Sequence, residues 1–278
     1  MSGPAPLPPG ARPAPGYEIL EHLARTGWLD VYDAWSEERD CRCVIKVVRP
    51  DRRGEEQLAE RLLREGRWLR DLSHPHLVRG YDTFASPEPL VVLETLTGET
   101  LDHLVHRLRH RPSASDVALL GVQLCSAVHY LHGRGLLHLD LKPSNVVVDR
   151  GHAKVLDLSV ARPPGPAPAG LGTRRYRAPE QGRQGPLTAA ADVWGIGVTL
   201  YEVACGDVPF TGGSADRTDP GDTGEPCPRG AQGAPPISSR RRLPPAMAAA
   251  VDACLLTSPT ARPTIAELTA ALKTSPPA

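Results

Sequence analysis

The sequence predicts an α+β protein made of two unequal halves, with strands concentrated in the first half and helices in the second. Segments 17–23, 31–35 and 42–48 alternate or run apolar with β-branched residues, which is the pattern of strands. Beyond about residue 99, apolar residues recur mostly at helical spacing. With 278 residues, the chain is long enough to bury a large core.

The first half, residues 17–96, is expected to contain one main helix. Segment 55–72 is rich in Leu, Glu and Arg at helical spacing, and it stops before the sequence SHP at 73–75. A further strand follows at 90–94, and we place a hinge at 94–98.

The second half, residues 99–278, is expected to be mainly helical with one short hairpin. The hairpin joins strands at 146–149 and 154–156 through an Arg-Gly turn. Helices are predicted by apolar periodicity at 116–132, 192–205, 245–256 and 264–272.

Proline and glycine gather in three places rather than spreading along the chain. The 30 prolines and 26 glycines concentrate in residues 1–16, 163–172 and 211–245. We interpret 1–16 as an N-terminal tail and 17–278 as the folded domain. Segment 211–245 is expected to be a loop without a full helix, because its composition disfavours regular structure.

Charge and cysteine content exclude several classes of protein. The formal net charge is zero, which argues against a general nucleic-acid or membrane-surface binder. No secretory signal is evident, and the longest uncharged apolar run, 193–201, is too short to span a membrane. The six cysteines lack the spacing of a disulfide framework or a zinc site, so we expect free thiols in the cytoplasm. The sequence does not indicate an oligomeric state.

The strongest chemical pattern is HLDLKPSN at 138–145. Phosphoryl transfer needs a carboxylate at the attacking hydroxyl, oxygen ligands for Mg²⁺, and cations on the transferred phosphate. Asp140, Asn145 and Lys142 supply one of each within this loop. Asp157, in VLDLS, follows a strand at a place suited to a second ligand for a hard cation.

A second pair of charged residues lies in the first half. The string CVIK puts Lys46 on a strand, and Glu65 in the next helix is well placed to pair with it. Such a pair would fix the lysine for the α- and β-phosphates of a nucleotide.

Together these strings resemble the serine/threonine protein kinases, in particular the eukaryotic-like kinases of bacteria. The resemblance runs from about Tyr17 to Leu272 and adds APE at 178–180, Asp192 before VWGIGVTLYE, and ARPT with Arg262. It implies a two-lobed fold, with a small antiparallel N-lobe carrying one main helix and a larger, mainly helical C-lobe. It also implies that Glu180 pairs with Arg262 and that Asp192 braces the catalytic loop.

The resemblance assigns a role to each of these residues, with ATP and Mg²⁺ (or Mn²⁺) as cofactors. Asp140 would be the catalytic base, Lys142 would stabilise the γ-phosphate, and Lys46, held by Glu65, would anchor ATP. Asn145 and Asp157 would bind the metal. The remaining nucleotide-contacting positions would be Leu23, Ala24, Gly27, Val31, Val44, Leu93 as gatekeeper, Glu94 and Leu96 at the hinge, and Val147 beneath adenine.

The same resemblance implies a protein substrate with Ser or Thr hydroxyls. Lys142 occupies the position typical of Ser/Thr kinases, and Thr173, in GTRRYRAPE, matches a threonine that contacts the catalytic aspartate in that class. Small-molecule kinases usually lack an APE-type segment. Arg174, Arg175 and Arg177 either favour acidic substrates or pair with nearby carboxylates, and the sequence leaves both open.

The nucleotide loop departs from the family. Aligned on Val31 and Lys46, the three loop glycines of the family fall on Ala24, Thr26 and Leu29. Side chains there restrict the backbone and keep its amides from phosphate. Val44 replaces the usual alanine against adenine, so we expect ATP binding to be weaker by about 1–3 kcal/mol, the scale of an overpacked site.

The activation segment departs as well. Leu139 stands where many regulated kinases have an arginine that receives a phosphate. Between Asp157 and Glu180 the only hydroxyls are those of Ser159, Thr173 and Tyr176. We therefore expect a kinase that is not switched on by phosphorylation of this loop. Ser159, at a position usually held by glycine, requires a negative φ.

Three functions remain from these observations. The first is an active Ser/Thr protein kinase, which the complete set of catalytic side chains favours. The second is a pseudokinase that binds nucleotide or partners without turnover, which the altered loop favours. The third, phosphorylation of a small molecule, is disfavoured by the APE segment.

Overall fold

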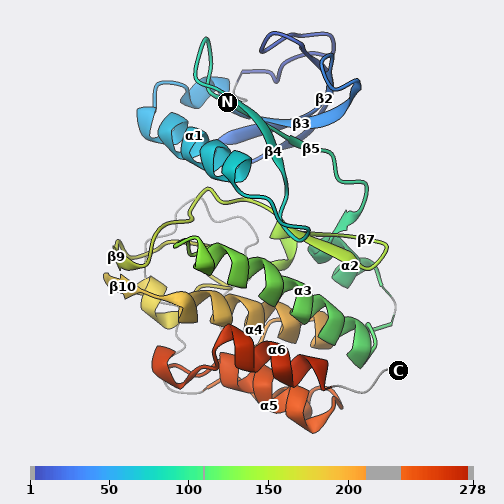
Figure 1. Cartoon of the computed structure of the whole chain (residues 1–278), viewed down its shortest axis with the longest axis vertical. Coiled ribbons are helices and arrows are strands. Elements are labelled where there is room, and N and C mark those ends of the chain that lie inside the picture. Colours follow the sequence, from blue (N-terminus) through green and yellow to red (C-terminus); the bar gives the residue numbers. More distant parts are fainter. Residues whose placement is uncertain (1–3, 109, 211–232, 275–278) are drawn as a thin grey trace. The chain divides into compact units, whose positions relative to one another are not determined.

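The computed structural model describes residues 4–108, 110–210 and 233–274. The chain divides into two compact units, Met1–Thr97 and Gly98–Ala278 (Figure 1). The boundary falls within the segment 94–98 that the sequence indicates as a hinge. Residues 211–232, most of the predicted Pro/Gly-rich loop, lie outside the described residues.

The first unit is built on a five-stranded antiparallel sheet with the order β1-β2-β3-β5-β4. Its strands are β1 Tyr17–Arg25, β2 Leu29–Ser36, β3 Cys41–Val48, β4 Gly80–Phe84 and β5 Leu90–Glu94. The sequence predicts all but β4. That strand has the sequence GYDTF, and Gly and Asp are depleted in strands, so its pairing with β5 rather than its own propensity defines it.

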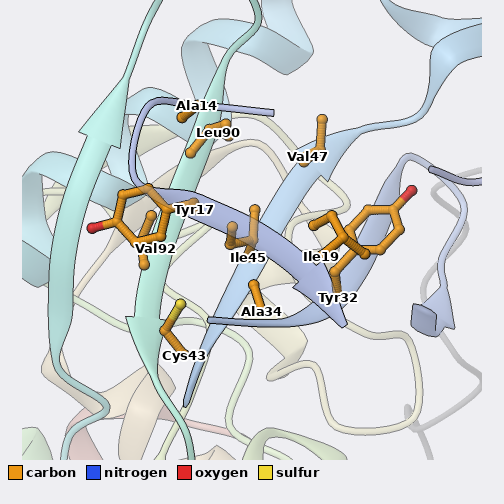
Figure 2. Packing of buried hydrophobic residues seen from close by; sticks show 10 residues of the cluster. All are labelled: Ala14, Tyr17, Ile19, Tyr32, Ala34, Cys43, Ile45, Val47, Leu90 and Val92. Atoms are coloured by element: carbon orange, nitrogen blue, oxygen red, sulfur yellow. The ribbon is translucent and has the colours of Figure 1, made fainter. Parts of the chain in front are cut away.

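The two faces of this sheet are covered by different segments. One face carries a buried apolar cluster from β1, β2, β3 and β5 together with Ala14 (Figure 2). Residues of the N-terminal segment, predicted as a tail, lie on this cluster: Leu7 and Ala11 pack against it, and the Gly10 amide donates to the Ile19 carbonyl (2.8 Å). The segment from residue 4 to 16 is thus attached to the sheet.

Helix α1, Glu56–Asp71, packs against β4 and β5 (Figure 1). Its only glycine, Gly66, lies where helix and sheet approach most closely, because a Cβ there would collide with Thr83 and Val91. This close packing buries Glu65 completely. The glycine therefore determines how deeply the neighbouring carboxylate lies against the sheet.

The second unit is mainly helical. Its helices are α2 Leu101–Arg107, α3 Ala114–Gly133, α4 Ala189–Cys205, α5 Pro245–Cys254 and α6 Ile265–Lys273. Its strands form two small sheets, β6 Glu99–Thr100 with β7 Val146–Asp149 and β8 His152–Val155, and β9 Gly165–Ala167 with β10 Gly185–Leu187. The sequence does not predict β9 and β10, because each three-residue strand contains a proline and a glycine.

Helix boundaries in this unit follow from capping groups. Ser113 and Asp116 form a capping box that starts α3, and Thr264 and Glu267 form another that starts α6. Helix α4 ends at Gly206, whose φ of +79° suits glycine at a helix C-terminus.

Helices α3 and α4 form the core of the second unit. Gly121 of α3 faces Leu200 of α4 and Leu272 of α6, where a larger residue would not fit. Among the described residues, α3 is the one helix long and apolar enough to cross a membrane by length and composition. However, 56% of that stretch is buried inside the protein, which is the behaviour of a core helix.

A buried ion pair joins the APE segment to the loop before α6. Arg262 donates to both oxygens of Glu180, at 2.6 and 2.8 Å, and its side chain is fully buried. The same guanidinium donates to the carbonyls of Ala190 and Leu256 and lies over the ring of Trp194. The expected pairing of Glu180 with Arg262 is present.

Replacing Glu180 with alanine is expected to lower the free energy of unfolding by about 3 kcal/mol, because it leaves a buried guanidinium without its counter-charge. Chemical denaturation measures the difference. The matched control is Glu55→Ala, which breaks an exposed pair with Arg52 and should have little effect. Equal effects of the two substitutions would contradict the prediction.

Glu202 of α4 is also buried, and its carboxylate predicts a pH dependence of stability. It accepts a hydrogen bond from the Tyr176 hydroxyl (2.8 Å), and burial raises the pKa of Glu202 above its ordinary value. A folded-state pKa above the unfolded one means that stability falls as pH rises from the unfolded pKa through the folded pKa.

Glu202→Gln keeps an acceptor for Tyr176 and removes the buried charge. We expect it to raise the melting temperature at about pH 7 and to change it little at about pH 4.5, near the unfolded pKa of Glu. Thermal unfolding at both pH values tests this, with the exposed Glu38→Gln as control. A stabilisation that is the same at both pH values would argue against a buried ionised carboxylate.

Candidate active site

The first unit positions a lysine through a buried carboxylate. Lys46 lies on β3, near the middle of the sheet, and its Nζ is 2.7 Å from Oε1 of Glu65. Glu65 is fully buried on α1, and the Lys46 side chain is 12% exposed. The predicted pair is present, and the surrounding protein excludes most water from it. The ammonium is thereby held in one place.

The strand register gathers five of the predicted nucleotide residues on one face of the sheet. Val31 pairs with Lys46, and Val44 pairs with Leu93. Because residues two apart on a strand share a face, Val44 and Lys46 do as well. Ala24 pairs with Val31 and joins the same face. The sheet thus carries Lys46 on a surface lined by small and aliphatic side chains.

Three further predicted residues lie off this register. Leu23 falls where the β1–β2 register shifts between His22 and Ala24, and it is 51% exposed. Glu94 ends β5, where its amide donates to the Arg79 carbonyl (3.0 Å) and its carboxylate accepts from the Arg79 amide (2.8 Å). Leu96 follows at the end of the first unit and is half-buried. An adenine contact for these residues stays a prediction.

The turn between β1 and β2 is closed by a side chain. The Thr26 amide donates to the Leu29 carbonyl (2.8 Å), and the Thr26 Oγ1 accepts from the Leu29 amide (2.9 Å) and more weakly from the Trp28 amide (3.4 Å). Thr26 therefore occupies amides that a glycine at this position would leave open. Gly27 lies between Thr26 and Trp28 in the sequence, and it is exposed with open space around it.

Arginines that follow β3 hold the tip of this turn. Arg49 donates to the Thr26 carbonyl (3.1 Å), and Arg52 donates to the Gly27 carbonyl (2.9 Å). Arg61 of α1 lies over the Trp28 ring, 4.6 Å from its centroid. The turn is thus fixed to its own unit by its carbonyls and by its aromatic side chain. The sequence shows the missing glycines but not these contacts.

The second unit holds the catalytic-loop residues together. The Asp140 carboxylate accepts from the Thr173 amide (2.7 Å) and from Nδ2 of Asn145 (3.1 Å). Nζ of Lys142 is 2.9 Å from Oδ2 of Asp140 and 2.5 Å from Oγ1 of Thr173. Asp140, Lys142 and Asn145 therefore lie within direct contact, as the sequence predicts. Thr173 contacts Asp140 through its backbone amide.

A buried aspartate fixes the backbone of this loop. Leu139 has a φ of +64°, a conformation that costs energy for a residue with a side chain. Asp192 of α4 is buried and accepts from the amides of Leu139 (2.7 Å) and His138 (2.9 Å), and His132 lies 2.8 Å from it. Asp192 therefore braces the loop as expected and offsets the strain.

His138 connects the loop to the β8 region. Its Nδ1 accepts from the Asp140 amide (3.2 Å), so its Nε2 carries the proton donated to the Leu156 carbonyl (3.0 Å). The ring is fully buried. Both ring nitrogens are therefore used in hydrogen bonds to the backbone, which gives His138 a structural role.

The two predicted metal ligands lie at adjoining backbone positions. The Leu156 amide donates to the Asn145 carbonyl (2.8 Å), and Asp157 is the next residue. Asp157 has a φ of +61°, and its Oδ1 accepts from the Ser159 amide (2.9 Å). The positive φ thus falls on Asp157 and not on Ser159. Serine at position 159 is expected to require a negative φ, and the backbone there meets that requirement.

This donor set fits a hard divalent cation with few protein ligands. Since Nδ2 of Asn145 is engaged by Asp140, its Oδ1 is the atom that a cation would use. Within the described residues, no group of three or more His, Cys, Asp or Glu could hold a metal ion. One amide oxygen and one carboxylate suit Mg²⁺, which keeps several waters and shares phosphate oxygens.

Val147, Arg177 and Gln181 complete the second unit's site, and of these the sequence does not single out Gln181. Val147 is buried in β7, opposite Thr100 and Lys154. Gln181 and Arg177 are buried and donate to backbone carbonyls of the segment 170–172. Arg177 stands directly before APE, and the sequence names it together with Arg174 and Arg175 without indicating that it is buried.

Known proteins resemble this chain in sequence. The protein kinase domain family model matches residues 17–272. Serine/threonine-protein kinase PknB of Mycobacterium leprae is 32% identical over 214 residues, and PknB of Mycobacterium tuberculosis is 33% identical over 215. Each match covers 71% of this chain and 34% of the relative, so the chain spans about a third of the length of these relatives.

A solved structure shows the same fold. The kinase domain of Mycobacterium tuberculosis PknI, crystallised as a point mutant, superposes with a TM-score of 0.74 at 21% identity, covering 97% of this chain and 98% of that one. The α+β arrangement expected from the sequence is confirmed. The family model, the PknB relatives and the fold together establish that this chain belongs to the protein kinase family, among its bacterial eukaryotic-like serine/threonine members.

Proposed function

We propose that this chain transfers the γ-phosphate of ATP to serine or threonine hydroxyls of a protein. The observation that carries the proposal is the arrangement around Asp140, whose carboxylate is oriented by Thr173, Asn145 and Lys142 at once. A carboxylate held by three donors can accept the proton of a substrate hydroxyl from one fixed direction. Such positioning is most of what phosphoryl transfer asks of a protein.

The other side chains supply charge in the proposed reaction. Lys142 is close to Asp140 and carries a positive charge toward the hydroxyl that is phosphorylated. Lys46 would bind the α- and β-phosphates, with Glu65 fixing it. Asn145 and Asp157 would hold Mg²⁺, which when bound neutralises charge on the phosphates. Each residue therefore contributes orientation or charge at a definite atom.

Specificity for serine or threonine is supported by Lys142 and Thr173. The Lys142 ammonium contacts both the Asp140 carboxylate and the Thr173 hydroxyl, so an ammonium and a short hydroxyl lie next to the carboxylate. A protein rather than a small molecule is supported by the APE segment, which is tied into the fold through Glu180 and Arg262. We propose a cytoplasmic location because the cysteines among the described residues are free thiols.

A pseudokinase is the alternative, and one observation favours it. The Thr26 hydroxyl occupies amides of the turn that would otherwise be open to phosphate. A protein of this kind would bind nucleotide or a partner without turnover. The retained Lys46, Asp140 and Asp157 support the active enzyme instead.

Phosphate transfer from labelled ATP with Mg²⁺, to the chain itself and to a generic basic protein, tests the proposal. Asp140→Asn is expected to lower the rate by at least about 100-fold, the lower range for loss of a general base. Asp149→Asn, the same change on the exposed hairpin, should leave the rate unchanged. Absence of transfer in the parent, together with detectable nucleotide binding, would establish the pseudokinase.

Nucleotide affinity tests the closed turn. We expect the parent to bind ATP about 1–3 kcal/mol more weakly than a kinase with a full set of loop glycines, so an ordinary micromolar affinity would contradict this. Thr26→Gly frees the two amides and is expected to tighten binding about tenfold, equivalent to one charge-assisted hydrogen bond.

Two arginine variants complete this experiment, measured by titration calorimetry with a nonhydrolysable ATP analogue. Arg52→Ala removes the hydrogen bond that holds Gly27, so the turn can move more freely toward a phosphate. This variant should also bind the nucleotide more tightly than the parent, by a smaller factor than Thr26→Gly. Arg53→Ala removes the same charge from the next residue, which pairs with Glu88 instead, and should have no effect. Weaker binding by Thr26→Gly would show that the closed turn supports nucleotide binding.

A further inference from the structure

Arg177 is a buried cation in the activation segment that the reaction itself does not use. The residue is 5% exposed, although arginine is seldom buried. Its Nε donates to the Leu171 carbonyl (3.0 Å), and its Nη2 donates to the carbonyls of Gly170 (2.6 Å) and Gly172 (2.7 Å). One guanidinium thus fixes three consecutive peptide groups.

Gln181 holds the same peptides from a second direction. Its Nε2 donates to the carbonyls of Leu139 (2.9 Å) and Leu171 (3.1 Å), and its own carbonyl accepts from the Gly170 amide (2.8 Å). Gly172 has a φ of +81° and lies so close to the Leu139 carbonyl that a Cβ would collide with it. The segment is therefore pressed against the catalytic loop.

The next residue along the chain touches the catalytic carboxylate. Thr173 follows Gly172, its amide donates to Asp140 and its hydroxyl contacts Lys142. Its carbonyl accepts from the Arg177 amide (3.0 Å), which closes the turn from 173 to 177. A shift of residues 170–172 would carry Thr173 with it and would change the hydrogen bonding of Asp140.

The segment has no evident means of being held by a phosphate. Residues 162–171 contain no hydroxyl, and Leu139 presents a buried apolar side chain beside the loop. Burying a guanidinium costs free energy unless its hydrogen bonds are made, so its placement here requires a compensating arrangement such as the three carbonyls provide.

We propose that Arg177 is the positioning residue that holds residues 170–173 in their catalytic arrangement without phosphorylation. The proposal rests on the kinase function proposed above. Of the two roles that the sequence leaves open for Arg174, Arg175 and Arg177, substrate binding is unavailable to Arg177 because it is buried, and its hydrogen bonds to backbone carbonyls are a third role that the sequence does not indicate.

The test compares Arg177→Gln and Arg177→Lys with the parent, and Arg183→Gln serves as the control because Arg183 is exposed six residues further on. Hydrogen–deuterium exchange is measured on peptides covering 168–176. We expect exchange there to rise about tenfold in Arg177→Gln, in line with loss of local protection, with the α3 and α4 peptides unchanged. Arg177→Lys should recover part of the protection.

Kinetics on the same variants separate positioning from general structure. Arg177→Gln should lower kcat about 10–100-fold while the KM for ATP stays within about twofold, because only groups around Asp140 are displaced. Arg177→Lys should restore part of kcat, and phosphatase treatment of the parent should leave its kcat unchanged. Native exchange and kcat in Arg177→Gln would overturn the proposal, as would faster exchange spread over the whole second unit.

The exchange and kinetic measurements together also distinguish a failure of this proposal from a failure of the proposed kinase function. If the parent transfers no phosphate, the kinase function fails, and exchange alone decides whether Arg177 holds the segment. Faster exchange confined to peptides 168–176 in Arg177→Gln would then show that Arg177 holds residues 170–173 in an inactive protein. Unchanged exchange would overturn it.

Discussion

The loop that carries Asp140 depends on one buried carboxylate, that of Asp192. It accepts hydrogen bonds from two consecutive amides of the loop and thereby holds Leu139 at a φ that costs energy. Because Leu139 precedes Asp140, the direction of the catalytic carboxylate follows from this strained backbone. Asp192 can act this way because α4 is buried along almost its whole length and leaves its first turn no freedom to move.

Buried charged groups recur wherever this chain has to fix a functional atom. Glu65 fixes Lys46, Arg177 fixes the peptides before Thr173, and Arg262 fixes the APE segment through Glu180. Each costs desolvation energy that a hydrophobic residue would not. In return, each group holds its partner in one orientation, since a charged group with several hydrogen bonds has few alternative positions. The packing of apolar residues stabilises the units, and these polar groups orient the site.

The sequence indicates the side chains that would touch phosphate or metal in the proposed reaction, because phosphoryl transfer limits which residue types can stand at those positions. It also predicts most helices, whose caps and periodicity are local. It misses β4 and the β9–β10 pair, which exist through pairing and run against their own propensities. The attachment of residues 4–16 to the sheet is missed for a related reason, since Pro/Gly composition says nothing about a docking surface. Thr26 is noticed only as a lost glycine, and its hydroxyl as an acceptor emerges only from the turn geometry.

The turn at Thr26 and the loop around Asp140 would act on different quantities in the proposed reaction. The closed turn changes which amides are free to bind phosphate, and that would affect the affinity for nucleotide. The loop around Asp140 keeps its full set of side chains, and its geometry would affect the rate once substrates are bound. Leu139 is held at a costly φ and Asp192 is buried to hold it there, and both orient Asp140. This orientation supports the proposed phosphate transfer, while the closed turn at Thr26 supports weaker nucleotide binding.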